Sequence, residues 1–341
     1  MANKDKFGCL ATAIGSLPDT DAAAGCRRVF RHMKDIPFWP QLPKRSPKEN
    51  MYLQFSEGFP GAVIENDHIY AGKAADLDTH LERVYVAYLE NRPDDFAVGD
   101  SYAAGLYEFV RHNDERFKFI KGQVTGPISW GLVATDRQQR GIIYDDTLGD
   151  TVARFLRLKA SWEEKFLRQM TNNTIIFVDE PYLTSLGSAF VSIPRERVIN
   201  LIGEVLCGIE GVNGVHCCGG TDWSLLLSLP TDIISFDAYN YANSLSLYAA
   251  DVKTFLERGG NIAWGIVPND EETIVKESVS SLSDRIGEAM APFTREGVPY
   301  RKVLEQALVT PSCGLASLSS DAADQALALL AGLSSKLKQK L

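Results

Sequence analysis

The sequence has no apolar run long enough to cross a bilayer, so it predicts no transmembrane helix. The polar segment Met1–Lys6 is followed by no signal-like apolar stretch, and we therefore expect a cytoplasmic protein. Basic charge is also scarce, because 35 Lys and Arg are outnumbered by 44 Asp and Glu and the net charge is −9. This acidic balance disfavours binding to nucleic acid and to anionic membranes, both of which require a basic surface.

The cysteines lack the spacing that a disulfide framework or a structural zinc ribbon requires. The six cysteines include no Cys-x2-Cys pair, and in a reducing compartment clustered cysteines favour metal binding or chemistry over disulfides. We expect Cys9, Cys26, Cys207 and Cys217 to be small buried apolar residues. The sequence also lacks a G-x-G-x-x-G turn and a recognisable linker, which disfavours the two-domain doubly wound fold that this length allows.

What the sequence does contain is a regular alternation of two patterns. Short, nearly continuous apolar runs, typical of parallel strands buried on both faces, alternate with segments of helical periodicity. This alternation predicts a single-domain α/β fold over residues 1–341, a (β/α)8 TIM barrel with an insertion at 56–118 between strands 2 and 3 that covers the barrel. The eight predicted strands are Leu10–Ile14, Met51–Phe55, Phe119–Val124, Ile175–Val178, Gly211–Val215, Asp232–Phe236, Asn261–Ile266 and Ala307–Thr310.

Helices are expected in the gaps between these strands. Pro194 suits the first turn of one helix, and Gly259-Gly260 suits the end of another. The predicted helices are Asp76–Asn91, Thr151–Met170, Pro194–Cys207, Asp222–Leu229, Ser244–Arg258, Glu271–Met290 and Asp321–Lys336.

Most of the chemically distinctive residues follow the predicted strands directly. In (β/α)8 barrels the active site lies at the carboxyl ends of the strands. His216 and Cys218 follow the fifth predicted strand, and Cys313 follows the eighth, which closure of the barrel would bring near. Imidazole nitrogen and thiolate sulfur are preferred ligands of zinc, and three protein ligands with an exchangeable fourth are typical of a catalytic site. The sequence therefore predicts a catalytic zinc site from His216, Cys218 and Cys313.

Two carboxylates, Asp179 and Glu180, follow the fourth predicted strand and precede Pro181. Carboxylates at the end of a buried strand are costly unless a partner satisfies them. One of them could cap a helix, which is a structural role, or one could bind the ammonium group of a substrate. The residues alone leave both roles open.

These motifs resemble the catalytic barrel of cobalamin-independent methionine synthase, within the wider group of uroporphyrinogen decarboxylase and methylcobamide:coenzyme M methyltransferases. The resemblance extends from Ile14 to Cys313. It implies that zinc is held by the H-x-C and P-x-C-G-L motifs and that homocysteine is bound by the I-G-S turn and by the aspartate of the D-E-P segment. The matching segments here are Ile14-Gly15-Ser16, Thr125-Gly126-Pro127, Asp179-Glu180-Pro181, His216-Cys217-Cys218 and Pro311-Ser312-Cys313-Gly314-Leu315.

The sequence also departs from the family pattern. Asp237 stands where the family has a glutamate zinc ligand, and we expect this shorter carboxylate to be the fourth metal ligand. The segment Gly265–Asp270 lacks the histidine that protonates the folate nitrogen in the family, and a second homocysteine-binding glutamate has no clear match. The chain also has one barrel, whereas the folate-using enzymes carry an additional N-terminal one.

The resemblance implies a zinc-dependent methyltransferase that converts homocysteine to methionine. Zinc would hold the acceptor thiol as a thiolate, which then attacks the methyl group. Because methylcobalamin, unlike methyl-folate, needs no acid at its leaving group, we expect methylcobalamin or a methylated corrinoid protein as donor. Asp179 favours homocysteine, which has an ammonium group, over coenzyme M, which has a sulfonate. The alternatives are a coenzyme M-type enzyme acting on another thiol, a metal-free decarboxylase of the uroporphyrinogen type, and a zinc-holding corrinoid-binding protein without turnover.

Overall fold

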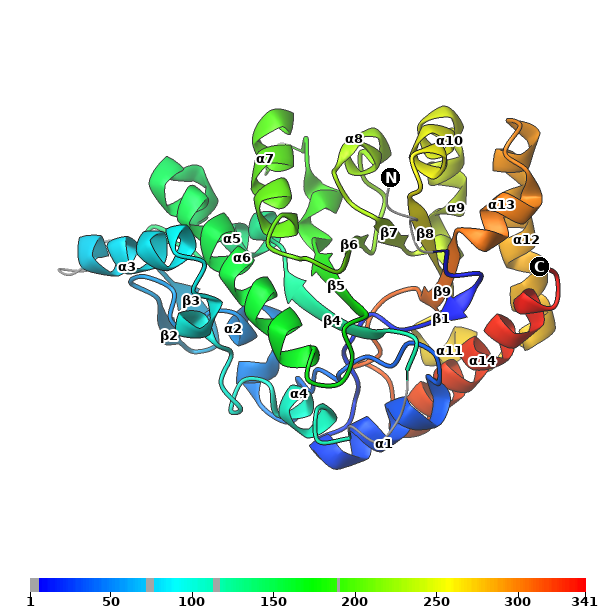
Figure 1. Ribbon diagram of the computed structural model, residues 1–341, viewed down its shortest axis with the longest axis horizontal. Coiled ribbons are helices and arrows are strands. Elements are labelled where there is room, and N and C mark those ends of the chain that lie inside the picture. Colours follow the sequence, from blue (N-terminus) through cyan, green and yellow to red (C-terminus); the bar gives the residue numbers. More distant parts are fainter. Residues whose placement is uncertain (1–5, 72–76, 113–116, 189–190) are drawn as a thin grey trace.

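Seven parallel strands form one curled sheet in the computed structural model, which describes residues 6–71, 77–112, 117–188 and 191–341 (Figure 1). The strand order is β1-β9-β8-β7-β6-β5-β4, so the first strand of the chain pairs with the last. The strands of this sheet are β1 (Leu10–Ala11), β4 (Ile120–Thr125), β5 (Thr174–Asp179), β6 (Val212–Cys217), β7 (Ile233–Phe236), β8 (Asn261–Val267) and β9 (Ala307–Pro311).

Seven of the predicted strands coincide with these observed strands, and the prediction for Met51–Phe55 is wrong. Met51–Gln54 instead forms the short helix α2. Asn50 is its N-cap, because the Asn50 side chain accepts a hydrogen bond from the Tyr52 N–H at 3.0 Å. A short apolar run is equally compatible with a strand and with a buried helical turn, so its periodicity could not distinguish them.

The irregular segment 37–41 lies between the two edges of the sheet and forms bridges to both. On one side the Trp39 N–H donates to the carbonyl of Lys121 in β4 at 3.3 Å. On the other side the Gln41 N–H donates to the carbonyl of Gly15, beyond β1, at 3.1 Å. Pro37 and Pro40 have no N–H to donate, which explains why this segment forms isolated bridges and not a continuous ladder.

The inside of the curled sheet changes from apolar to polar along the strands. Near the amino ends, side chains such as Phe177 and Ile233 belong to an apolar cluster that is separate from the main core. Two residues further along the same strands, and so on the same face, stand Asp179 and Ser235. The fold therefore places buried polar groups at the carboxyl ends of the strands, and the apolar cluster lies next to them on the amino-end side.

Helices pack against the outside of the sheet and enclose the main core (Figure 1). The segment Glu271–Met290, predicted as one helix, contains α11 and most of α12. The chain starts a second helix there because Ser278 and Ser281 form a capping box at the beginning of α12. The prediction over Ser244–Arg258 covers the end of α9 and all of α10. The helices are α1 (Ala22–His32), α2 (Met51–Gln54), α3 (Leu77–Leu89), α4 (Ala104–Phe109), α5 (Pro127–Val133), α6 (Asp146–Leu167), α7 (Arg195–Leu206), α8 (Trp223–Ser228), α9 (Ala238–Ser246), α10 (Ala249–Glu257), α11 (Glu271–Ile274), α12 (Val279–Arg295), α13 (Tyr300–Glu305) and α14 (Ser320–Lys338).

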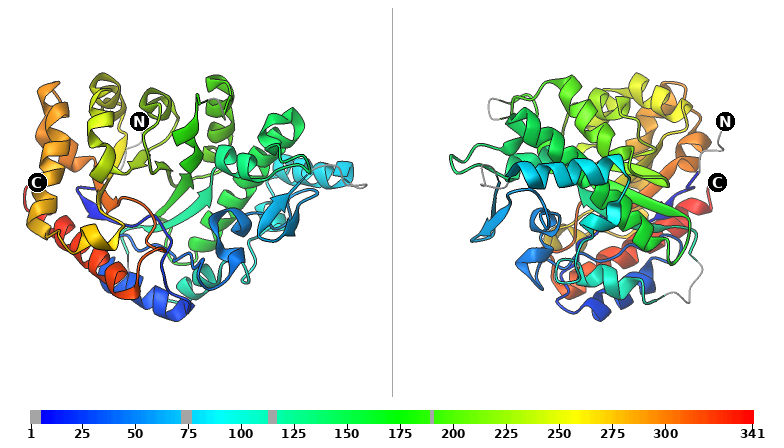
Figure 2. Two further views of the ribbon diagram at one scale, coloured as in Figure 1. Left: turned by 180° about the vertical axis from the view of Figure 1, so that it is seen from behind. Right: turned by 60° about the vertical axis from the view of Figure 1, so that its left-hand side comes forward.

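The other predicted helices coincide with α3, α6, α7, α8 and α14, whereas α1, α4, α5 and α13 were not predicted. Asp76, the first residue of one predicted helix, lies outside the described residues. Within 56–118, the described part contains the antiparallel pair β2 (Val63–Glu65) and β3 (His68–Tyr70), together with α3 and α4. The β2–β3 pair and α3 lie at one end of the molecule in Figure 1 and in the left view of Figure 2. Among the described helices, none combines the length and apolar character needed to cross a membrane.

Candidate metal and substrate site

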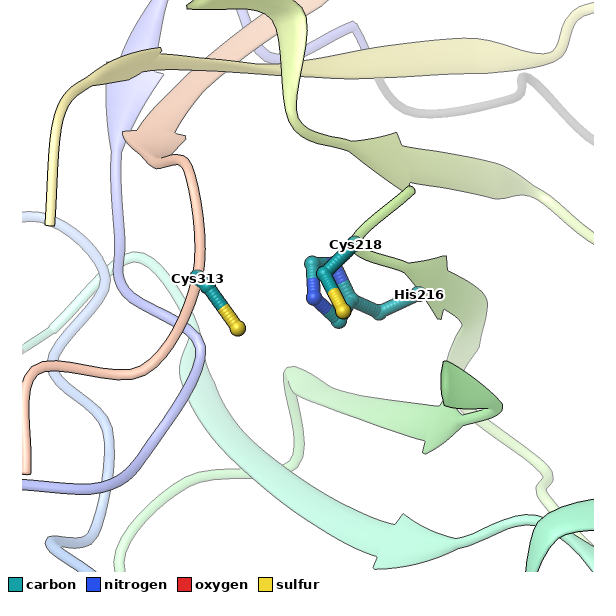
Figure 3. Close-up of side chains that lie close together, drawn as sticks. All are labelled: His216, Cys218 and Cys313. Atoms are coloured by element: carbon teal, nitrogen blue, oxygen red, sulfur yellow. The ribbon is translucent and has the colours of Figure 1, made fainter. Parts of the chain in front are cut away.

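Three of the predicted metal ligands lie together at the carboxyl ends of two strands. His216 is in β6, Cys218 follows it, and Cys313 follows β9 (Figure 3). One ligand atom from each of these residues lies within 4.8 Å of the other two. In the close-up, the Cys313 sulfur points from its own loop towards the His216 and Cys218 side chains. The structure thus unites residues that are far apart in the sequence into one site.

The His216 imidazole has one partnered and one unpartnered nitrogen. Its Nδ1 lies 2.9 Å from the Ser235 hydroxyl oxygen, in the neighbouring strand β7. Its Nε2 is buried and has no hydrogen-bond partner among the described residues. A buried polar atom without a partner is costly, and metal-binding histidines commonly use one nitrogen for the metal and the other for an orienting hydrogen bond. The arrangement of His216 therefore fits a metal ion.

The two cysteines differ strongly in their affinity for a proton. A hydrogen bond from Cys313 and the nearby His216 imidazole lower the pKa of the Cys218 thiol to about 4. The hydrogen bond to Cys218, together with burial, raises the pKa of Cys313 well above its usual range. The two shifts are opposite in direction, so Cys218 loses its proton more readily than Cys313. Thiolate is the form that binds zinc, and metal binding would release the remaining proton.

The loop that carries Cys313 is held against the predicted substrate-binding turn Ile14-Gly15-Ser16. The Leu315 N–H donates to the Ser16 carbonyl at 2.9 Å. A Cβ atom on Gly314 would overlap the Ser16 hydroxyl, so a larger residue there would force this hydroxyl to move. The turn is also held by β4, because the Ile14 carbonyl accepts a hydrogen bond from the Lys121 ammonium at 2.6 Å.

Lys121 is fully buried inside the sheet. Its ammonium also donates to Gln123 Oε1 at 3.0 Å and lies 4.5 Å from the centre of the Phe177 ring. Burial lowers the pKa of Lys121 to about 8, although Asp179 and Glu163 favour its charged form. Lys121 and Gln123 inside the buried strand β4 were a signal in the sequence that our prediction did not use.

The two carboxylates after β5 have different roles. Glu180 Oε1 accepts from the Ile128 N–H at 2.9 Å, and Oε2 accepts from the Ser129 N–H at 2.8 Å, both in the first turn of α5. Glu180 thus has the structural role, at a helix N-terminus. Gly126 permits this, because a Cβ atom there would overlap the Glu180 carboxyl.

Asp179, in contrast, has an unpartnered oxygen. Its Oδ1 is buried and has no hydrogen-bond partner among the residues that the structure describes. Burial raises the pKa of Asp179 to about 6, while the nearby His216 and Lys121 oppose that rise. An unpartnered buried carboxylate oxygen is suited to a cationic group of a ligand.

Asp237 is not brought into the three-residue cluster. It is the N-cap of α9, where Oδ1 accepts from the Asn240 N–H at 2.9 Å and Oδ2 from the Asn240 side-chain amide at 2.7 Å. Burial raises the pKa of Asp237, and the negative charge of Cys218 adds to that rise. The carboxylate therefore lies near the cluster but is engaged by the helix.

The remaining cysteines follow the sequence prediction with one exception. Cys9, Cys26 and Cys217 are buried, and burial raises the pKa of Cys9 and Cys217 to about 12. Cys207 is exposed, so the prediction of burial is wrong there. It is the C-cap of α7, where the helix ends at the surface.

Two solved structures share this fold. The chain is similar to a B12-independent methionine synthase from Shewanella sp. W3-18-1 in complex with selenomethionine, with a TM-score of 0.60, 16% identity and coverage of 97% of this chain and 98% of that one. It is also similar to a methyltransferase from Methanosarcina mazei, with a TM-score of 0.60, 12% identity and coverage of 100% and 95%. No family model and no curated protein sequence matches the chain. At these identities the similarity establishes the fold, and the resemblance noted in the sequence is confirmed at that level.

Proposed function

We propose that this protein is a zinc-dependent methyltransferase that transfers a methyl group to the thiol of homocysteine to give methionine. The observation that carries the proposal is the buried, unpartnered Nε2 of His216 beside the thiols of Cys218 and Cys313, at the carboxyl ends of strands in a fold shared with two methyltransferases. We also interpret the curled sheet as a (β/α)8 barrel in which segment 37–41 stands for the second strand, because it bridges both sheet edges.

His216, Cys218 and Cys313 would hold the zinc ion, which leaves a fourth position for the acceptor thiol. Asp237, our expected fourth ligand, already accepts a hydrogen bond from Asn240 at each of its two oxygens. Bound zinc supplies one chemical effect, which is to lower the pKa of the acceptor thiol so that it is present as a thiolate.

The chain's own residues would orient the acceptor amino acid. The unpartnered Oδ1 of Asp179 would bind its ammonium group, next to the metal ligands. The turn Ile14-Gly15-Ser16, which is bonded to the Cys313 loop, would hold the other end of the amino acid. Fixing the thiol and the ammonium at two separate points places the sulfur for in-line attack on a methyl group.

The donor we propose is methylcobalamin or a methylated corrinoid protein. The segment after β8 contains no histidine, and there the Asn269 Oδ1 accepts from the Ser312 hydroxyl at 3.0 Å, beside the Cys313 loop. Asn269 is therefore used structurally and cannot protonate a leaving nitrogen. A corrinoid donor requires no such proton, because the cobalt leaves without one.

The test is to purify the protein, measure bound zinc, and assay methyl transfer from methylcobalamin to homocysteine. We expect stoichiometric zinc and formation of methionine, both lost in Cys218→Ser and Cys313→Ser. Zinc without methionine would support the site but direct the search to coenzyme M and other thiols. Turnover with methyl-tetrahydrofolate alone would refute the corrinoid donor, and absence of zinc would favour the decarboxylase alternative.

A further inference from the structure

The carbonyl groups of the turn Ile14-Gly15-Ser16 are all occupied by donors from other parts of the protein. The Ile14 carbonyl accepts from the Lys121 ammonium at 2.6 Å, and the Gly15 carbonyl accepts from the Gln41 N–H at 3.1 Å. The Ser16 carbonyl accepts from the loop that follows β9. The turn is therefore held on its carbonyl side by three separate segments of the chain.

The N–H groups of Gly15 and Ser16, in contrast, donate to no atom of the described residues. Gly15 is buried, and a buried N–H without a partner is costly. A trans peptide unit points its C=O and the following N–H in opposite directions, and the described residues contain no cis peptide bond. Since the Ile14 carbonyl points at Lys121, the Gly15 N–H points away from it. Unpartnered backbone N–H groups of this kind are suited to an anionic group.

Lys121 is placed to keep this peptide unit in one orientation. Its ammonium is fully buried and is itself fixed by Gln123 Oε1 at 3.0 Å. The Gln123 side chain also supports the turn directly, because a Cβ atom on Gly15 would lie 2.7 Å from it. Since the ammonium is shielded from solvent, its bond to the Ile14 carbonyl polarises the peptide unit and makes the Gly15 N–H a stronger donor.

We propose that Lys121 is a positioning residue that sets the affinity for the acceptor carboxylate by orienting and polarising the Gly15 N–H. This inference rests on the proposed function, in which the turn holds the end of the amino acid away from the thiol. Lys121 does not touch the acceptor. Its ammonium is engaged by the Ile14 carbonyl, by Gln123 and by the face of the Phe177 ring.

The experiment compares two thiols that differ only in the carboxylate, homocysteine and 3-aminopropane-1-thiol. Lys121→Met keeps the length of the side chain and removes its charge and its donors. We expect the KM for homocysteine to rise about tenfold, close to the loss of one hydrogen bond to a charged group, with kcat and bound zinc little changed. The KM for 3-aminopropane-1-thiol should stay the same. Equal changes for both thiols, or no change for either, would refute the role of Lys121.

Lys159→Met is the matched control, because Lys159 is a second fully buried lysine with the same kinds of contact. Its ammonium donates to the carbonyls of Glu57 at 2.7 Å and Ala97 at 3.2 Å, and it lies 5.1 Å from the centre of the Phe155 ring. None of these contacts involves the turn. The control should therefore keep the preference for homocysteine, and an equal loss of preference in both variants would mean that the effect is a general loss of packing.

Gln123→Met provides a second variant that keeps the charge of Lys121, in case Lys121→Met does not fold. It removes the amide oxygen that fixes the ammonium, so the KM for homocysteine should rise about threefold and that for 3-aminopropane-1-thiol should not change. An unchanged preference in folded Gln123→Met would contradict the proposal.

Calorimetric binding of the two thiols to the zinc-loaded protein separates this inference from the proposed function. The wild type should prefer homocysteine, and Lys121→Met should lose most of that preference. If the preference is the same in the variant, the role of Lys121 is refuted while the proposed function stands. If neither thiol binds the wild type, both proposals fail together.

Discussion

The Ser235 hydroxyl oxygen lies 2.9 Å from Nδ1 of His216, and Nε2 of the same ring is left without a partner. The two residues face each other across the β6–β7 ladder, so the strand register itself sets the orientation of the imidazole. When Nε2 binds a metal, Nδ1 carries the ring hydrogen and donates it to Ser235. In the proposed site the serine would therefore orient a metal ligand without touching the metal.

Replacing Ser235 with alanine should weaken zinc binding by about 10- to 100-fold, because the imidazole loses the hydrogen bond that orients it. Competition with a chromophoric chelator measures the dissociation constant. Ser334→Ala is a matched control, since its buried hydroxyl donates to the Cys9 carbonyl at 2.7 Å, next to the amino end of β1. An unchanged zinc affinity in Ser235→Ala would show that Nδ1 needs no partner.

Asp237→Asn and Cys313→Ser should separate a helix cap from a metal ligand. Cys313→Ser should lose bound zinc, because a cysteine sulfur is replaced by a poor ligand. Asp237→Asn should keep its zinc and lose less than about 1 kcal/mol of stability, since asparagine is also a good N-cap. Metal analysis of both purified variants decides the question. Loss of zinc from Asp237→Asn would establish the carboxylate as the fourth ligand.

Asp179→Asn should weaken homocysteine binding much more than zinc binding. The amide keeps the size of the side chain but removes the charge that would bind the substrate ammonium. Zinc titration and homocysteine calorimetry on the same preparation give both affinities. Equal losses of the two would mean that Asp179 is structural.

Gly126→Ala should destabilise the protein, by about 1–3 kcal/mol, because the added Cβ would overlap the Glu180 carboxyl that caps α5. Gly287→Ala is the matched control. A Cβ atom at Gly287, in helix α12, meets no atom within 4 Å, and alanine should stabilise the helix by up to about 1 kcal/mol. Denaturant unfolding of the two variants should give shifts of opposite sign, and shifts of the same sign would contradict the packing at Gly126.

Glu163 should make the stability of the protein fall as the pH rises from about 5 to 8. Burial raises the pKa of this carboxyl to about 8, although Trp39 and Gln123 donate hydrogen bonds to it. The pKa of Glu163 is higher in the folded protein than in the unfolded chain, so between these two pH values the native state binds the extra proton. The free energy of unfolding is therefore highest below the pKa of the unfolded chain and falls as the pH rises to the pKa of the folded protein.

The Glu163→Gln variant should lack this dependence. The wild type should lose about 2 kcal/mol of its free energy of unfolding between pH 5 and pH 7.5 that the variant does not lose. Denaturant unfolding at several pH values measures the difference. A constant difference would mean that Glu163 is already ionised in the folded protein at pH 5.

The sequence by itself determined the order of the strands and the residues that stand at their carboxyl ends. Continuous apolar runs mark strands buried on both faces, and in a parallel sheet all carboxyl ends meet on one side. This was enough to place Asp179, His216 and Cys313 on a common rim. It failed for Met51–Phe55, where Asn50 caps a helix, and it gave no prediction for the bridging segment 37–41, where prolines interrupt the apolar pattern.

Only the tertiary structure decided how the polar groups on that rim are partnered. Sequence could not tell that Glu180 caps α5 while Asp179 keeps a free oxygen, or that Asp237 is engaged by Asn240. Nor could it place the Lys121 ammonium at the Ile14 carbonyl. These outcomes depend on side chains from different strands and helices meeting at distances of a few ångströms. Local sequence encodes which elements form, whereas the packing of those elements selects each polar partner.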